Sequence, residues 1–168
     1  MKKMFCCVIG MLMVSCLVLA GCKKASEKIA EKTIESGMAK DGVKAKVDAS
    51  GQTVTIQDKD GKSVYVAGKS ATLPDNFPKD VYVYDGASIM ASISVPDGFN
   101  LTLETGDSAD KVVNAIKSKM TGLGWKEEMT MNQGKNVMVG YKMEKRSVMY
   151  SITPDNKTMI SMTVSAPK

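Results

Sequence analysis

A regular alternation of apolar and polar side chains in the C-terminal part of the chain restricts its fold more than any other feature. It runs through residues 125–131, 136–143, 147–153 and 158–165, which are separated by the turns "NQGK", "EKRS" and "PDNK". Because successive side chains of a strand point to opposite faces, this period of two predicts four antiparallel strands joined by hairpins. The face expected to be buried carries Val137, Val139, Tyr141, Val148, Tyr150, Ile152, Ile160, Met162 and Val164.

The segment before these strands has a helical period instead. Its apolar residues recur every three or four positions, as on one face of an α-helix. Asp107 or Ser108 is the expected N-cap, Asp110 suits the positive end of the helix dipole, and Gly122 and Gly124 are expected to end the helix. The predicted buried stripe consists of Val112, Val113, Ile116, Met120 and Leu123.

Two more strands are expected before the helix, on either side of the turn Pro96-Asp97-Gly98. Ile89, Ala91, Ile93 and Val95 are expected to share one face of the first strand, and Phe99, Leu101 and Leu103 one face of the second. A single amphipathic helix buries its stripe most simply on one face of an antiparallel sheet. The predicted fold is therefore α+β, with one main helix packed on one face of the sheet.

The N-terminal third is expected to be less regular. Residues 42–68 contain short alternating runs around Ser50-Gly51 and Asp60-Gly61, which predict a three-stranded meander. Residues 69–168 are expected to form the α+β domain, and its opening contains Pro74 and Pro78, which disfavour helix and indicate an extended arm docked on the core. Residues 22–41 are polar with few apolar side chains, so we expect a helical or flexible tether.

The first 22 residues look like an export signal. Lys2 and Lys3 precede an apolar run that ends in the tetrapeptide Leu19-Ala20-Gly21-Cys22. The run is barely long enough to span a membrane, and it lacks an A-x-A-like cleavage site. The tetrapeptide resembles the lipobox of bacterial lipoproteins.

That resemblance implies cleavage after residue 21 and lipidation of Cys22, and thus a membrane partner for the mature chain. In Gram-negative members of the family, Asp in the next position commonly retains the protein at the inner membrane. This chain has Lys23 there. We therefore expect a cell-envelope protein that is anchored in the outer membrane and faces the periplasm.

A second resemblance covers roughly the last hundred residues. The stretch "LPDNFPKDVYVYDGASI" and a helix that ends in "GLGW" resemble small bacterial envelope lipoproteins. It implies no activity and no site residues.

The composition argues against most catalytic chemistry. The chain has no histidine, and its four cysteines are Cys6, Cys7, Cys16 and the lipidation candidate Cys22. Most nucleophilic triads and zinc sites are thereby excluded from the mature chain, and no pair of carboxylates is placed by its spacing for acid–base work. The net charge of +5 is scattered, which argues against nucleic acid as a partner. We expect a non-enzymatic protein without a cofactor.

Methionine is unusually frequent, with seven of the fourteen at or after Met129. Methionine is commonly an adaptable core filler, and this is the main interpretation. An alternative is a site for Cu(I) or Ag(I), because thioethers prefer soft ions. By strand parity, Met129, Met131 and Trp125 would share a face, with Met138 or Met143 as a third ligand. The arrangement resembles the small periplasmic copper chaperones, although their site includes a histidine.

The main functional prediction is a structural or protein-interaction module of the envelope, with an envelope protein as partner. Met90, Met138, Met149 and Met159 are expected on the outward sheet face, together with polar residues. An exposed apolar patch there would indicate a partner site. Alternatively, the meander covers that face in ordinary two-layer packing.

Overall fold

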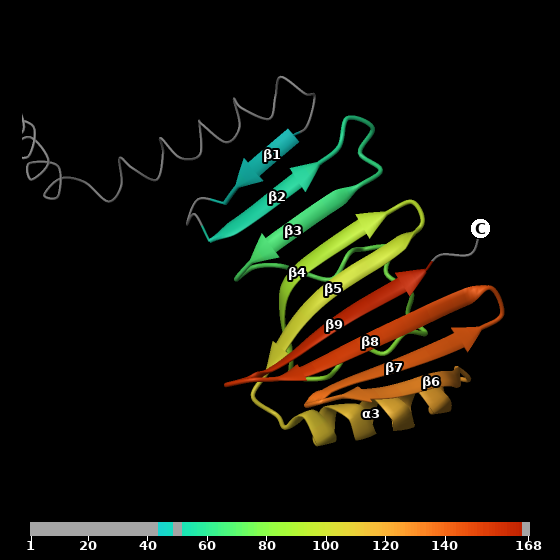
Figure 1. Cartoon of the computed structure of the whole chain (residues 1–168). Helices are drawn as coiled ribbons and strands as arrows, with labels where there is room; N and C mark the ends of the chain where they lie inside the picture. The colour runs from blue at the N-terminus through green and yellow to red at the C-terminus, as the bar shows by residue number, and fades with distance from the viewer. Residues whose placement is uncertain (1–43, 49–51, 166–168) are drawn as a thin grey trace, which may run out of the picture.

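The structure is a computed structural model of the whole chain, and it describes residues 44–48 and 52–165. Its centre is a nine-stranded antiparallel sheet in the order β1-β2-β3-β4-β5-β9-β8-β7-β6, with one long helix, α3 (Figure 1). This confirms the predicted α+β class. The strands are β1 (Lys44–Val47), β2 (Thr53–Gln57), β3 (Val64–Gly68), β4 (Ser88–Val95), β5 (Gly98–Thr105), β6 (Lys126–Gln133), β7 (Asn136–Met143), β8 (Arg146–Pro154) and β9 (Thr158–Ser165). The helix α3 spans Ala109–Gly122.

The predicted meander belongs to the same sheet as the rest of the chain. β3 pairs with β4 in antiparallel register, with Tyr65 opposite Ile93 and Ala67 opposite Ala91. The strands β1 to β3 therefore extend the sheet sideways (Figure 1). The alternative that they cover its second face is wrong.

The helix packs on β6, β7 and β8 on one side of the sheet. Ser108 is its N-cap and accepts a hydrogen bond from the Lys111 amide, while Leu123 is the C-cap. Val112, Ile116 and Met120 are fully buried, as predicted, but Leu123 is 42% exposed. Since the helix ends at Gly122, Leu123 no longer follows the helical stripe and points to solvent.

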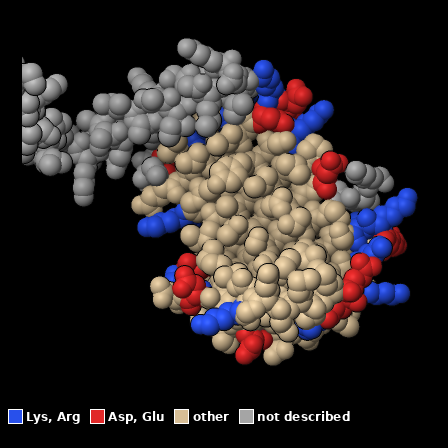
Figure 2. Space-filling model, in the orientation of Figure 1, with Lys and Arg blue, Asp and Glu red and all other residues tan. Residues whose placement is uncertain are grey.

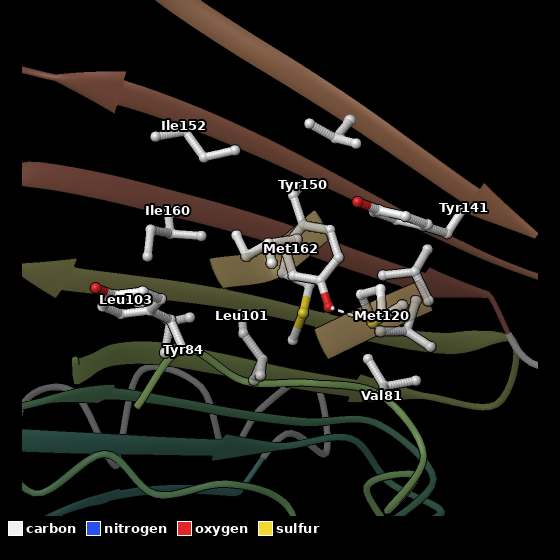
Figure 3. Close-up of a cluster of buried hydrophobic side chains, with 14 of the residues drawn as sticks. Val81, Tyr84, Leu101, Leu103, Met120, Tyr141, Tyr150, Ile152, Ile160 and Met162 are labelled. Carbon is white, nitrogen blue, oxygen red and sulfur yellow. Dashed lines mark hydrogen bonds between the residues drawn. The ribbon is translucent and has the colours of Figure 1, made fainter. Parts of the chain in front are cut away.

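The strand faces predicted to be buried all meet α3 and the arm. Leu101, Leu103, Val139, Tyr150, Ile152 and Ile160 are at most 1% exposed. In Figure 3, Tyr150 stands at the centre of this core with its hydroxyl directed at Met120, and Oη donates to Sδ over 3.2 Å. Methionine is thus a core filler at Met120 and Met162, both fully buried.

The arm, residues 69–87, crosses the same side of the sheet beside α3. Phe77 packs edge-on against Phe99 of β5, with ring centroids 5.3 Å apart. Backbone turns close from Phe77 to Pro74 and from Val81 to Pro78, so the arm is a series of turns. With Phe77, Val81 and Tyr84 buried in the main cluster, it docks on the core as predicted.

A cluster of polar contacts around Trp125, here called the Trp125 cluster, fixes the arm near the C-terminal end of α3. The indole Nε1 of Trp125 donates to the carbonyl oxygen of Asp80 over 2.6 Å. The Arg146 guanidinium donates to both carboxylate oxygens of Asp80, and its centre lies 5.1 Å from the Trp125 ring centroid. The hydrogen bonds from Arg146 lower the pKa of the Asp80 carboxyl. This cluster joins the arm, the residue before β6 and the first residue of β8.

A second polar contact holds the arm at the other end of the helix. Tyr84 Oη donates to Asp107 Oδ2 over 2.7 Å, just before the N-cap. Burial, followed by this carboxylate, raises the pKa of Tyr84 to about 12. Both ends of α3 are therefore tied to the arm.

Replacing Gly98 is expected to disturb the pairing of β5 with β9. Gly98 has φ of 149°, and a Cβ there would lie 2.0 Å from the Val164 carbonyl oxygen, which is backbone and cannot turn away. We expect Gly98→Ala to lower the free energy of unfolding by more than about 1 kcal/mol in urea denaturation. Gly86→Ala is the matched control, because Gly86 also has positive φ but has open space at its Cβ. If both substitutions lowered the free energy of unfolding equally, the strain of a positive φ would explain the loss, and the close approach to Val164 would not contribute.

Candidate functional site

The second face of the sheet, opposite α3 and the arm, is the candidate functional site, and we call it the open face. Cross-strand pairing places one row of residues across it, from β1 to β6. The row consists of Ala45, Ile56, Tyr65, Ile93, Asn100, Thr163, Met149, Gly140 and Met129. None of these side chains is charged.

The neighbouring row has the same character. It consists of Val47, Val54, Ala67, Ala91, Thr102, Ser161, Ser151, Met138 and Met131. Figure 2 shows the result as a broad uncharged centre, with lysine, arginine and acidic side chains gathered around the rim. The open face is therefore a wide surface of hydroxyl, aliphatic and thioether groups, where a partner would meet little desolvation cost from charges.

Two β-bulges decide which residues reach the open face. In β4 the register shifts between Ile89 and Ala91, with Met90 as the extra residue. Ile89 pairs with the buried Leu103 and lies on the helix side, whereas Ala91 and Ile93 lie on the open face. The prediction that these residues share one face is wrong, because a bulge shifts the alternation by one residue.

The second bulge separates the residues of the predicted metal site. In β6 the register shifts between Glu127 and Met129, so Glu128 is extra. Trp125 is 2% exposed on the helix side. Met129 and Met131 pair with Gly140 and Met138 on the open face. The structure thus brings Met129 and Met131 together but excludes Trp125, contrary to the parity argument.

The candidate third ligands are separated in the same way. Met138 lies directly opposite Met131 on the open face. Met143 packs against the main core on the helix side and cannot join them. Met149, which was not among the predicted ligands, pairs with Gly140 and lies beside Met129. The sequence predicted Met149 on the outward face, and the structure confirms this, but the prediction did not include it among the metal ligands.

The four methionines of this region, Met129, Met131, Met138 and Met149, are here called the methionine patch. A methyl group built at Gly140 would lie 3.3 Å from Met149 Cε, 3.6 Å from its Sδ and 3.6 Å from Met129 Cβ. The thioether of Met149 therefore lies over the glycine, and Met129 Cβ is close to the same point. A shallow hollow of about 270 Å³ adjoins them and is also lined by Glu128, Ser147 and Thr163.

The space between α3 and the sheet offers no comparable opening among the described residues. Trp125, Tyr141, Tyr150 and their neighbours are almost fully buried there. The Tyr141 hydroxyl is buried without a hydrogen-bond partner in the described part of the chain, and burial raises the pKa of Tyr141 to about 12. The rings of Tyr141 and Tyr150 fill the region edge to face, 6.0 Å apart.

The described residues hold no group of three His, Cys, Asp or Glu side chains that could bind a metal ion. Another hollow, of about 350 Å³, lies between the arm and strands β3 and β4. Its lining includes one carboxylate, Asp75, and one ammonium group, Lys62. A pair of carboxylates for acid–base work is not assembled in this hollow.

Comparison with known proteins gives one match. Residues 88–159 match a family model described as START domain-like. The match runs from β4 into β9 and covers less than half of the chain, so it supports the α+β fold of this part. No curated protein and no solved structure matches the chain.

The predicted lipidation site, Cys22, lies outside the described residues, as do the predicted signal peptide and the whole of the predicted tether. Within residues 44–48 and 52–165 there is no helix long and apolar enough to cross a membrane.

Proposed function

We propose that this protein is a non-enzymatic, lipid-anchored lipoprotein of the bacterial cell envelope that binds another envelope protein through its open face. The observation that carries the proposal is the uncharged centre of that face (Figure 2), where two rows of paired, uncharged residues run from β1 to β6. Sheets that expose one face to water usually carry polar residues on that face. Here the charges stand at the rim, an arrangement that is typical of a binding surface.

The anchor in this proposal is Cys22, and it rests on the lipobox resemblance alone. Attachment at Cys22, in the outer membrane and on the periplasmic side, would hold the domain near its partner. An anchored partner is confined to the same surface, which raises its effective concentration. The proposed partner therefore has an uncharged, hydroxyl-rich or apolar surface and belongs to the same membrane.

Adding one charge at the centre of the open face is expected to abolish this binding. Ser161 is exposed and pairs with Thr102 in the middle of the sheet. In Ser161→Arg, the partner would have to bury an unpaired guanidinium. We expect at least a tenfold loss of the cross-linked complex, with little change in stability because the site is exposed.

Ser118→Arg is the matched control, because Ser118 is exposed on α3, on the other side of the molecule. The measurement is photo-cross-linking in intact cells, with the reactive group at residue 161 or residue 118 of otherwise wild-type protein. A band captured with the reactive group at residue 161 should be absent when the group is at residue 118. For the two arginine variants the reactive group is placed at residue 102. There the band should weaken in Ser161→Arg and stay unchanged in Ser118→Arg. Equal capture from both faces, or no effect of the new charge, would refute the proposal.

A further inference from the structure

We propose that the methionine patch is a binding site for one soft monovalent cation, Cu(I) or Ag(I), with Met129 and Met149 as its first two ligands. This site differs from the one that strand parity predicts, because Trp125 is excluded and Met149 is included. It lies on the open face, but this proposal does not rest on the partner binding proposed above.

The geometry of the sheet supports two sulfur ligands over Gly140. The side chains of Met129 and Met149 come from strands on either side of β7. Because residue 140 has no side chain, Met149 lies over its backbone, with Sδ 3.6 Å from the point that a Cβ would occupy. Met129 Cβ is equally close to this point. Each side chain has three rotatable bonds, so the two thioethers can turn toward a shared ion.

The other two methionines are placed to complete the coordination. Met138 is diagonal to both Met129 and Met149, at a separation of about 7–8 Å between α-carbons, which long side chains can span. Met131 lies directly opposite Met138 and is 48% exposed, so it is free to move. The register thus places four methionines at neighbouring positions of the open face.

The chemistry of these groups selects the ion. Thioether sulfur is a soft, neutral ligand that prefers Cu(I), whereas Mg²⁺ and Ca²⁺ require several oxygen ligands. The only carboxylate that lines the adjoining hollow is Glu128, and it pairs with Lys142 over 3.5 Å. A hard divalent ion would thus find one carboxylate that is already paired, while a soft ion would find Met129 and Met149 at the hollow, with the other two methionines of the patch at neighbouring positions.

The test uses the full-length lipidated protein in detergent, with ¹³C-methyl-labelled methionine, titrated with silver nitrate in chloride-free buffer. The methyl resonances of Met129, Met131, Met138 and Met149 are expected to shift and to saturate at one equivalent. Met120 and Met162 are fully buried and serve as internal references that should not move. Anaerobic titration with Cu(I) should give the same pattern.

The decisive variant is Met129→Leu combined with Met149→Leu, which roughly conserves volume and should preserve the fold. It is expected to weaken Ag(I) binding at least tenfold. Met90→Leu combined with Met159→Leu is the matched control and should bind as the wild type does. The proposal is overturned if the first variant binds normally, or if Met90 and Met159 shift together with the patch and without saturation. Neither outcome bears on the partner experiment, which uses different residues and a different readout.

Discussion

Trp125→Ala is expected to lower the free energy of unfolding by about 3–5 kcal/mol, the range for removing a large buried aromatic side chain. Trp125 is 2% exposed and packs where α3, the arm and β8 meet. Its loss would remove the indole donor from the Asp80 carbonyl and leave Arg146 without the ring on which it lies. The expected consequence is a loosened arm as well as a cavity.

Urea denaturation, monitored by far-ultraviolet circular dichroism, measures this loss of stability without relying on tryptophan fluorescence. Leu123→Ala is the control, because Leu123 lies two residues earlier but is 42% exposed. Its expected effect is about 0.5 kcal/mol or less. A Trp125→Ala variant as stable as Leu123→Ala would mean that the Trp125 cluster contributes little to the free energy of unfolding. The arm would then be held by other contacts.

Cys22→Ser is expected to move the protein from the membrane fraction to the aqueous fraction completely. The proposed anchor is the lipid on this thiol, and each buried methylene contributes about 0.8 kcal/mol to membrane binding. Serine has no thiol to accept the lipid, so the loss is all or none. Metabolic labelling with a palmitate analogue and fractionation of the cells measure it.

Cys16→Ser is the matched control for this experiment. Cys16 precedes the lipobox and is expected to leave with the signal peptide, so this variant should label and fractionate like the wild type. If Cys22→Ser still carried label, or if both variants lost it, the assignment of the lipidated residue would fail. The binding surface on the sheet would then have to act without this anchor.

The sequence predicted the buried side of this fold well, because local periodicity determines it. The alternation through Val148, Tyr150 and Ile152 and the helical stripe through Val112 and Ile116 each hold within a single element, and all five residues are buried. A strand or helix with such a pattern has one way to bury its apolar side chains. The class of fold follows directly.

The open face could not be predicted as one surface, because it depends on pairing between distant segments. The sequence of β3 does not indicate that this strand pairs with β4. The bulges at Met90 and Glu128 become evident only when each strand is aligned with its neighbour. Each bulge then reverses the parity of the residues beyond it. This is why the sequence placed Trp125 with Met129, and why Met149 was not predicted as its neighbour.

The bulge at Glu128 also affects how copies of the protein can meet. β6 is an outermost strand of the described sheet, and such a strand offers unpaired backbone groups to any passing strand. In β6 these groups lie beside Lys126, Glu127 and Glu128, and the bulge twists the ladder at that point. At the opposite edge, β1 has only four residues. Both edges of the described sheet thus disfavour the addition of further strands and growth into fibrils. Copies of the protein or its partners are therefore expected to associate through side chains on a face of the sheet.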